Sequence, residues 1–360
     1  MKIKCLSLLL ALLVFLPLLG GCAAGRGSAD VHVFYYTYSD TYISTVRSAL
    51  DKKLKDAGIR YQDHDSNNSQ TTQTEQVQTA ITKGAKLLIV NIVTTGSDDA
   101  ASGIVSLAKN AGIPVVFFNR EVSDAVVNSY DQCVFVGTDA AEAGYLQGDM
   151  IGDYVVQNYD QIDLNGDGTI SYVMFMGEKG NNEAIYRTRY SVENANKKLT
   201  AAGKPALAFY DPANTDQYLL DREGKWSAQA ANEYMTTILT SYNPTNKNMV
   251  ELIICNNDGM AEGAISALAS AGYNKGSGDG ITVPVFGVDA TSAAKELIRA
   301  GKMAGTIKQD AEGMAEAIED IAENVLEGEA MLDDMDDYNM DRNAAKVRIA
   351  YGVYLGEEND

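Results

Sequence analysis

The stretch Leu87–Asn119, LLIVNIVTTGSDDAASGIVSLAKNAGIPVVFFN, decides the fold class. Two almost uninterrupted apolar runs, Leu87–Val93 and Pro114–Asn119, flank a segment over Ser97–Ala111 that has the apolar spacing of a helix. Strands with apolar side chains on both sides are typical of parallel sheets, which helices cover on both faces. The stretch therefore predicts a βαβ unit of a doubly wound α/β sheet.

The same alternation continues on both sides of this stretch. Before it, the pattern predicts strands at Val31–Tyr36 and Ile59–Gln62 and helices at Tyr42–Ala57 and Gln70–Lys83. After it the pattern starts again, with strands at Ser171–Met176, Ala206–Tyr210, Leu252–Cys255 and Val283–Val288 and helices at Ala140–Tyr159, Asn182–Ala202, Lys225–Tyr242 and Gly259–Ala271. Two successive α/β sets predict two similar Rossmann-like lobes with a cleft between them.

Length and composition fit this architecture and exclude several functions. A chain of 360 residues is long enough for two domains, and its 46% hydrophobic and 22% charged residues are typical of globular proteins. The net charge of −20 disfavours nucleic acid and anionic membrane surfaces as partners, because both are bound through positive charge. His32 and His64 are the only histidines, which disfavours zinc sites and histidine-based catalysis.

The first 21 residues have the pattern of a signal peptide. Two lysines near the N-terminus precede an apolar run, Leu6–Leu19, which at fourteen residues is too short to span a bilayer as a helix. The run ends in Leu19-Gly-Gly-Cys22, which resembles the bacterial lipobox and predicts lipidation of Cys22. Residues 22–28 would then form a lipidated tether. The alternative is a plain secretory peptide with an incidental cysteine.

The other cysteines give no sign of redox or metal chemistry. Cys5 lies in the signal peptide, and Cys133 and Cys255 each lie inside an apolar stretch. Two such residues are more typical of small buried side chains than of a disulfide framework. The sequence contains no CxxC motif or Cys/His cluster.

Polar residues follow the predicted strands at the edge where ligands bind in α/β sheets. They are Tyr36–Asp40, Asn119 with Arg120, Asn256–Asp258, and Asp289. Asn and Asp also favour turns and helix N-caps, so each residue alone has a structural explanation. Their convergence from both lobes predicts a polar binding cleft.

Several long motifs carry a resemblance to a known family. They are Val115–Glu121 (VVFFNRE), Ser129–Gln132 (SYDQ), Val136–Asp139 (VGTD), Asp163–Gly168 (DLNGDG), Asn256–Ala261 (NNDGMA) and Pro284–Ala290 (PVFGVDA). Through them, the chain from Val31 to Gly352 resembles the galactose/glucose-binding proteins, which are substrate-binding components of bacterial sugar ABC transporters. The resemblance implies a type I periplasmic-binding-protein fold with a three-crossing hinge. The expected N-terminal lobe comprises residues 29–138 and 308–343, and the expected C-terminal lobe comprises 139–307 and 344–360.

The resemblance also implies a monosaccharide site. Hydroxyl groups need carboxylates and amides, and the apolar face of a sugar needs aromatic rings. The positions matching the hydroxyl-binding residues of the family are Asp40, Asn119, Arg187, Asn257 and Asp289, those matching its stacking residues are Tyr42 and Trp226, and Tyr36 also lines the pocket. Without the resemblance, Trp226 would be a partly buried helix residue and Arg187 a surface charge.

Three pocket positions depart from the pattern of the family. Asn181 and Glu183 stand where the family has His and Asp, and Gln309 stands where it has Asn. These substitutions keep hydrogen-bonding capacity but leave the pocket width and the preferred sugar open.

The loop Asp163–Gly168 has the alternating oxygen ligands and the turn glycine of an EF-hand calcium loop. Met174 occupies the twelfth position, where an EF-hand needs a bidentate Glu, so a remote carboxylate must close the site. The resemblance implies Glu251 for this role and Ser171 as a weak ligand. The complete predicted set is Asp163, Asn165, Asp167, Thr169, Ser171 and Glu251. The alternative is a polar turn without metal.

We therefore expect a monomeric, lipid-anchored receptor on the extracytoplasmic face of the cell membrane. It would capture D-galactose, D-glucose or a methyl-galactoside, pass it to a membrane permease, and hold a structural Ca²⁺. An enzyme is disfavoured because the chain lacks nucleophile-elbow, P-loop and HExxH motifs. A sugar-responsive repressor would begin with a basic helix-turn-helix. A sensor or importer for another sugar, such as a pentose, remains the alternative.

Overall fold

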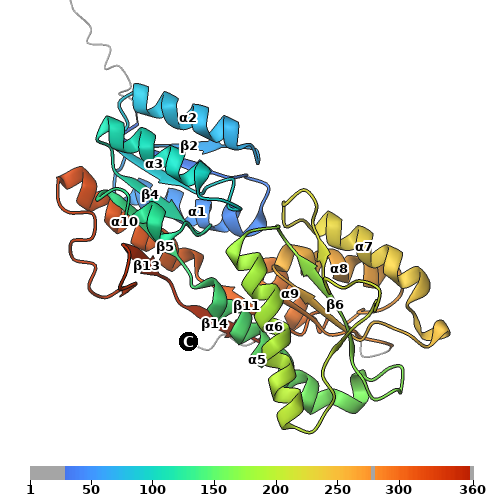
Figure 1. Cartoon of the computed structure of the whole chain (residues 1–360). Coiled ribbons are helices and arrows are strands. Elements are labelled where there is room, and N and C mark those ends of the chain that lie inside the picture. The colour runs from blue at the N-terminus through green and yellow to red at the C-terminus, as the bar shows by residue number, and fades with distance from the viewer. Residues whose placement is uncertain (1–28, 277–279, 357–360) are drawn as a thin grey trace, which may run out of the picture.

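The computed structural model describes residues 29–276 and 280–356, which form two α/β lobes (Figure 1). Each lobe is built on one seven-stranded sheet with helices on both faces. The predicted fold class, two doubly wound α/β lobes joined by a hinge, is confirmed. The predicted signal peptide and tether lie outside the described residues.

The first lobe carries a sheet with the strand order β12-β13-β5-β4-β3-β1-β2. Its strands are β1 (Val31–Tyr35), β2 (Tyr61–Asp65), β3 (Leu87–Val90), β4 (Val115–Phe118), β5 (Cys133–Gly137), β12 (Asn339–Met340) and β13 (Lys346–Arg348). Helices α1 (Thr41–Asp56) and α10 (Ala311–Glu327) pack on one face, and α2 (Gln70–Thr82), α3 (Asp99–Ala111) and α4 (Asp124–Val127) pack on the other. The four residues of β3 and of β4 are all buried, because both faces of these parallel strands are covered.

The second lobe carries a sheet with the order β14-β11-β10-β9-β6-β7, and β8 also pairs with β6. Its strands are β6 (Ser171–Met176), β7 (Ala208–Phe209), β8 (Leu219–Leu220), β9 (Leu252–Cys255), β10 (Val285–Asp289), β11 (Gly305–Gln309) and β14 (Tyr351–Tyr354). Helices α5 (Ala140–Ile162) and α6 (Asn182–Ala201) cover one face, and α7 (Ala228–Ser241), α8 (Asp258–Ser270) and α9 (Ser292–Arg299) cover the other. A short 3-10 helix, Pro244–Asn246, precedes β9.

The chain crosses between the lobes three times. It passes from β5 to α5 through Thr138, from β11 to α10 through Asp310, and from β13 to β14 through Ile349 and Ala350. β11, which precedes the second crossing, and β14, which follows the third, pair antiparallel at the edge of the second sheet. The three crossings form the hinge that joins the lobes.

Two predicted lobe boundaries differ from the strand pairing. β11 runs to Gln309 in the second sheet, so this lobe extends past the predicted end at Ile307. β13 was predicted to belong to the second lobe but pairs with β5 in the first. Contacts of β13 with the first lobe explain this pairing. Val347 is fully buried in the core of the first lobe, and Lys346 forms ion pairs with Glu121 and Asp124.

Most predicted elements are present with shifts of a few residues. Both ends shift in β2, which runs from Tyr61 to Asp65 instead of Ile59–Gln62 and carries the polar residues YQDHD. Its apolar pattern is weak because β2 is an edge strand of the first sheet. The elements β5, α4, β8, α9, β11, α10 and β12–β14 were not predicted.

Candidate functional site

A cavity lies between the lobes, at the carboxyl ends of strands from both sheets. The residues predicted from the sequence all line it: Tyr36, Asp40, Tyr42, Asn119, Asn181, Glu183, Arg187, Trp226, Asn257, Asp289 and Gln309. Ile43 and Arg120 complete the lining. Strand ends and helix starts from both lobes therefore meet in one cleft, as expected for ligand sites in α/β sheets.

The first lobe supplies a tyrosine–carboxylate pair to the cleft. Tyr36 follows β1, and its hydroxyl donates a hydrogen bond of 2.6 Å to Asp40. Asp40 is also the N-cap of α1 and accepts from the backbone N–H of Ile43. Because one carboxylate oxygen caps the helix, the side chain is held in place while the other oxygen faces Tyr36. Asn119 follows β4 with φ of +60° and has its side-chain oxygen bonded to Asn91.

The start of α6 supplies three buried polar side chains from the second lobe. Asn181 is its N-cap and accepts from the N–H of Ala184. Glu183 lies in the first turn, and Arg187 lies four residues later on the same face. Burial raises the pKa of Glu183 to about 7, although nearby Arg187 opposes the shift. Glu183 therefore titrates near neutral pH.

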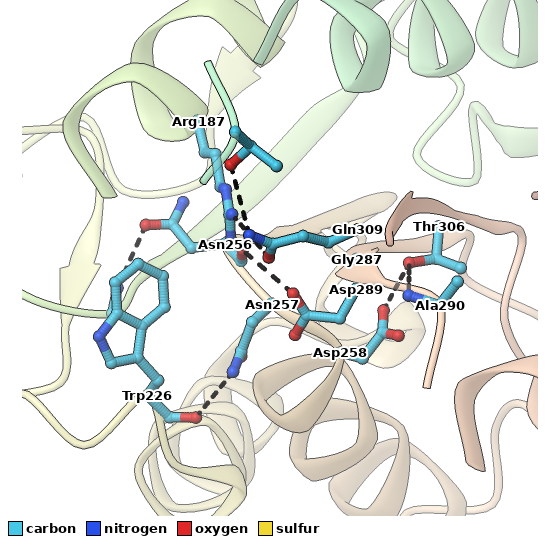
Figure 2. A network of polar contacts seen from close by, with 12 residues as sticks. Arg187, Trp226, Asn256, Asn257, Asp258, Gly287, Asp289, Ala290, Thr306 and Gln309 are labelled. Atoms are coloured by element: carbon cyan, nitrogen blue, oxygen red, sulfur yellow. Dashed lines mark hydrogen bonds and ion pairs between the residues drawn. The ribbon is translucent and has the colours of Figure 1, made fainter. Parts of the chain in front are cut away.

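Trp226 forms the apolar wall of the cavity. Its ring lies directly over Gly177, where an added Cβ would come within 2.1 Å of ring atom Cδ2. Glycine at this position is therefore required for the ring to lie flat on the end of β6. The backbone oxygen of Trp226 accepts a hydrogen bond of 3.2 Å from Asn257, which is itself the N-cap of α8 (Figure 2).

Asp289 lies at the end of β10 opposite Arg187, with 4.0 Å between its Oδ1 and the Nη1 of the arginine (Figure 2). Burial raises the pKa of Asp289 well above its usual range, and Arg187 only partly offsets this effect. Its backbone φ of +126° is unusual for a residue other than glycine, and such strain is found mostly at functional sites.

Behind Asp289, the buried Asp258 supports the loop that follows β10. Asp258 accepts a hydrogen bond from the hydroxyl of Thr306 at 2.6 Å (Figure 2). It also accepts from the N–H of Thr291 at 2.8 Å. These bonds tie α8, β11 and the start of α9 together. Asp258 therefore fixes the backbone on which Asp289 stands.

An ion pair between the lobes was not predicted. Arg120, after β4, donates to Glu178, after β6, at 2.5 Å. Glu178 also accepts from Thr95 of the first lobe and from Asn181 and Trp226 of the second. The guanidinium of Arg120 lies 4.1 Å from the centre of the Tyr36 ring. Glu178 comes two residues after a predicted strand, so the rule that found the other cleft residues applies to it as well.

Four polar atoms in the cavity lining are buried without a hydrogen-bond partner among the described residues. They are the Tyr42 hydroxyl, Glu183 Oε1, and the Nε atoms of Arg120 and Arg187. Buried polar groups are normally paired, and leaving them unpaired is costly. The cavity therefore suits a small ligand that both donates and accepts hydrogen bonds.

In the predicted calcium loop, carboxylate side chains accept hydrogen bonds from backbone N–H groups of the loop itself. Asp163 accepts from the N–H groups of Gly166, Asp167 and Gly168. Asp167 accepts from the N–H of Thr169.

Glu251 joins the two ends of the loop. It accepts from the N–H groups of Asn165 and Ser171 and from the Ser171 hydroxyl. Burial raises the pKa of Glu251, and these hydrogen bonds oppose the shift.

Within residues 29–276 and 280–356, no set of three or more acidic, His or Cys side chains is arranged to hold a metal ion. However, Asn165 Oδ1 is buried without a partner in this part of the chain, and the loop offers the hard oxygen donors that calcium prefers. Calcium binding stays a prediction.

The predicted lipidated residue, Cys22, lies outside the described residues. Cys133 and Cys255 are buried free thiols, as expected. None of the helices in the described part of the chain is long and apolar enough to cross a membrane.

Comparison with known proteins gives the class to which this fold and cleft belong. Residues 31–330 match the periplasmic binding protein domain, and the chain belongs to this family. Proteins of this family bind solutes for transport, so the chain is a binding component and not an enzyme.

Individual relatives narrow the class further. The chain is 34% identical over 343 residues to the D-galactose/methyl-galactoside binding periplasmic protein of Haemophilus influenzae, covering 94% of this chain and 93% of the relative. A solute binding protein from Bacillus halodurans with bound myo-inositol has a TM-score of 0.67 at 23% identity, covering 92% and 95% of the two chains. One from Clostridium phytofermentans with bound β-D-glucose has a TM-score of 0.66 at 22% identity, covering 91% and 94%. The chain is an extracytoplasmic sugar-binding component of an ABC transporter.

Proposed function

We propose that the protein captures D-galactose, D-glucose or a methyl-galactoside and delivers it to the membrane permease of an ABC transporter. The observation that carries the proposal is the convergence of the eleven predicted side chains, from both lobes, on one cleft with unpartnered polar atoms. The relative from Haemophilus influenzae, named for D-galactose and methyl-galactoside, supports the choice of sugar.

Binding would work by closure of the lobes around the sugar. Trp226 and Tyr42 offer ring surfaces from opposite lobes, and Asp40, Asn119 and Asp289 offer directional acceptors and donors. A ligand that contacts both lobes binds the closed form better than the open form, so it shifts the population toward closure.

Three residues of the cleft favour a second class of sugar, the pentoses. Asn181, Glu183 and Gln309 line the cleft at the positions where the sequence departs from the galactose/glucose pattern. Glu183 is longer than Asp by one methylene and reaches further into the cavity. A pentose, which lacks the hydroxyl on the sixth carbon, is the alternative ligand.

Calorimetric titration with galactose, glucose, methyl-galactoside, ribose, xylose and arabinose tests the proposal. We expect the hexoses to bind best, because each polar group left unpaired by a wrong sugar costs about 1–3 kcal/mol, about ten- to a hundredfold in affinity. Trp226→Ala should weaken binding strongly, and Trp226→Phe, which retains a ring, should recover part of the affinity. Binding of a pentose alone would reject the hexose assignment. If no sugar binds to the wild type, the sugar pocket itself is rejected.

We also propose a structural Ca²⁺ held by Asp163, Asn165, Asp167, the Thr169 carbonyl, Ser171 and Glu251. An ion that binds only the native state stabilises it by about 2.7 kcal/mol at a hundred times its Kd. A chelator should therefore lower the Tm of the wild type, and Asp167→Asn, which removes a negative charge but keeps an oxygen ligand, should reduce that difference. Asp160→Asn, at a nearby carboxylate whose side chain is 95% exposed, is the matched control. An unchanged Tm of the wild type with chelator would reject the site.

We propose that Cys22 carries a lipid anchor on the extracytoplasmic face of the membrane and that the protein acts as a monomer. Metabolic labelling with a fatty acid should mark the wild type and Cys5→Ser but not Cys22→Ser. Equal labelling of all three proteins would reject the anchor. Light scattering of the mature chain without lipid should give the mass of one copy, and a dimer mass would reject the monomer.

A further inference from the structure

The three crossings of the hinge meet in a buried hydrogen-bonded cluster. We call Thr138, Gln309 and Tyr351 the hinge cluster; Thr138 lies in the first crossing, and Gln309 and Tyr351 are the strand residues next to the second and third. The hydroxyl of Thr138 donates to the hydroxyl of Tyr351 at 2.8 Å, and the Gln309 amide donates to Thr138 at 3.3 Å. All three residues are buried.

Arg187 connects this cluster to the ligand cleft. Its Nη2 donates to the Gln309 side-chain oxygen at 3.3 Å (Figure 2). The same Nη2 donates to the Tyr351 hydroxyl at 2.9 Å. Its Nη1 donates to the backbone oxygen of Asn256 at 2.9 Å. The same guanidinium lines the cavity and lies 5.8 Å from the centre of the Trp226 ring. One side chain therefore touches both the sugar cleft and the hinge.

The hydrogen bonds of the cluster divide between the two lobes. Gln309 and Tyr351 are paired across β11 and β14 of the second sheet, and Arg187 belongs to α6 of the same lobe. Thr138 is tied to the first lobe, because its backbone oxygen accepts from Arg348 of β13 at 2.7 Å. Within the hinge cluster, the two bonds between Thr138 and the residues Tyr351 and Gln309 therefore span the lobes. A rotation about the hinge changes the lengths of these two bonds.

We propose that Tyr351 is a positioning residue for ligand binding, whose hydroxyl couples the orientation of Arg187 in the cleft to the angle between the lobes. The inference rests on the proposed function and deepens it. The Tyr351 hydroxyl accepts from Thr138, which is tied to the first lobe, and from Arg187 of its own lobe, so the bond that spans the lobes and a bond that orients the arginine share one oxygen atom. Removing the hydroxyl leaves Arg187 and Thr138 without this shared acceptor.

Tyr351→Phe tests the coupling, because it removes one hydroxyl and keeps the ring. Tyr354→Phe is the matched control: it is a buried tyrosine of the same strand whose hydroxyl bonds to Arg299 away from the cleft. In calorimetric titration with the best sugar, we expect about a tenfold loss of affinity for Tyr351→Phe and none for Tyr354→Phe. In the double variant with Thr138→Val, the combined loss of affinity should be smaller than the product of the two single losses, since both substitutions remove the bond between the two hydroxyls.

Unchanged affinity of Tyr351→Phe, or losses that multiply in the double variant, would overturn the coupling. If the wild type binds no sugar in the panel, the proposed function fails, and a measurement without ligand decides the hinge proposal separately. Asn68 Nδ2 of the first lobe donates to the backbone oxygen of Glu223 of the second lobe at 3.2 Å. In an Asn68→Cys, Glu223→Cys background, the rate of disulfide formation reports how often the lobes close. We expect Tyr351→Phe to lower this rate severalfold relative to Tyr354→Phe, and equal rates would overturn the proposal.

Discussion

Glu178→Gln removes the charge that joins the two lobes at the mouth of the cleft. Glu178 accepts hydrogen bonds from Arg120 and Thr95 of the first lobe, while Asn181 and Trp226 hold it from the second. The contact to Arg120 spans the lobes, because the two residues follow strands of different sheets, and a separation of the lobes would break it. We therefore expect the substitution to destabilise the closed form specifically.

The size of the effect follows from the burial of the pair. The side chain of Arg120 is 4% exposed and that of Glu178 is 17% exposed. Removing one partner of a buried ion pair typically costs 3–5 kcal/mol. Glutamine keeps an oxygen that can accept from Arg120, and Glu178 is partly solvated, so we expect about 2 kcal/mol, roughly a thirtyfold loss of sugar affinity.

Calorimetric titration with the best-binding sugar measures this loss, and thermal unfolding checks that each lobe stays folded. Glu223→Gln is the matched control, since Glu223 is exposed at the same rim and pairs with Lys225 of its own lobe. Affinity of Glu178→Gln within twofold of the wild type would refute the reasoning, because it would mean that the ion pair contributes nothing to closure.

Three further changes test other parts of the structure. Burial and neighbouring Asp51 raise the pKa of Asp63 to about 8, so the stability that its protonation contributes is full below about pH 4 and is lost as the pH rises through 8. Asp63→Asn should therefore raise the Tm at pH 8 by a few degrees and flatten its pH dependence, and an unaltered Tm profile would contradict this. Burial in the cleft raises the pKa of the Glu183 carboxyl to about 7, so the stability that its protonation contributes to the cleft is full below about pH 4 and is lost as the pH rises through 7. Sugar affinity should therefore fall over this range, but not in Glu183→Gln. Gly177→Ala should displace the Trp226 ring, weaken sugar binding about tenfold and change the fluorescence of this single tryptophan, whereas wild-type emission and affinity would argue against the close contact.

The fold and most of the cleft could be predicted from the sequence because both depend on local patterns. Apolar runs such as β3 and β4 identify strands buried on both faces, and residues such as Asp40 and Asn257 follow strands and cap helices. The partner of Arg120 could not be predicted, because Glu178 lies on the other lobe and the pair depends on how the lobes are oriented. The role of Tyr351 was hidden for a similar reason, since three distant crossings must meet before its contacts exist.

The last segment of the chain contributes a strand to each sheet: β13 to the first and β14 to the second. The first sheet can therefore be complete only after Arg348 has left the ribosome, and the second only after Tyr354, whichever lobe begins to fold first. A chain that ends before Lys346 would lack strands in both lobes at once, and would expose the edges of β5 and β11 that these strands cover. The two lobes are separate in space, but neither can complete its sheet during synthesis until the same C-terminal segment of the chain has been made.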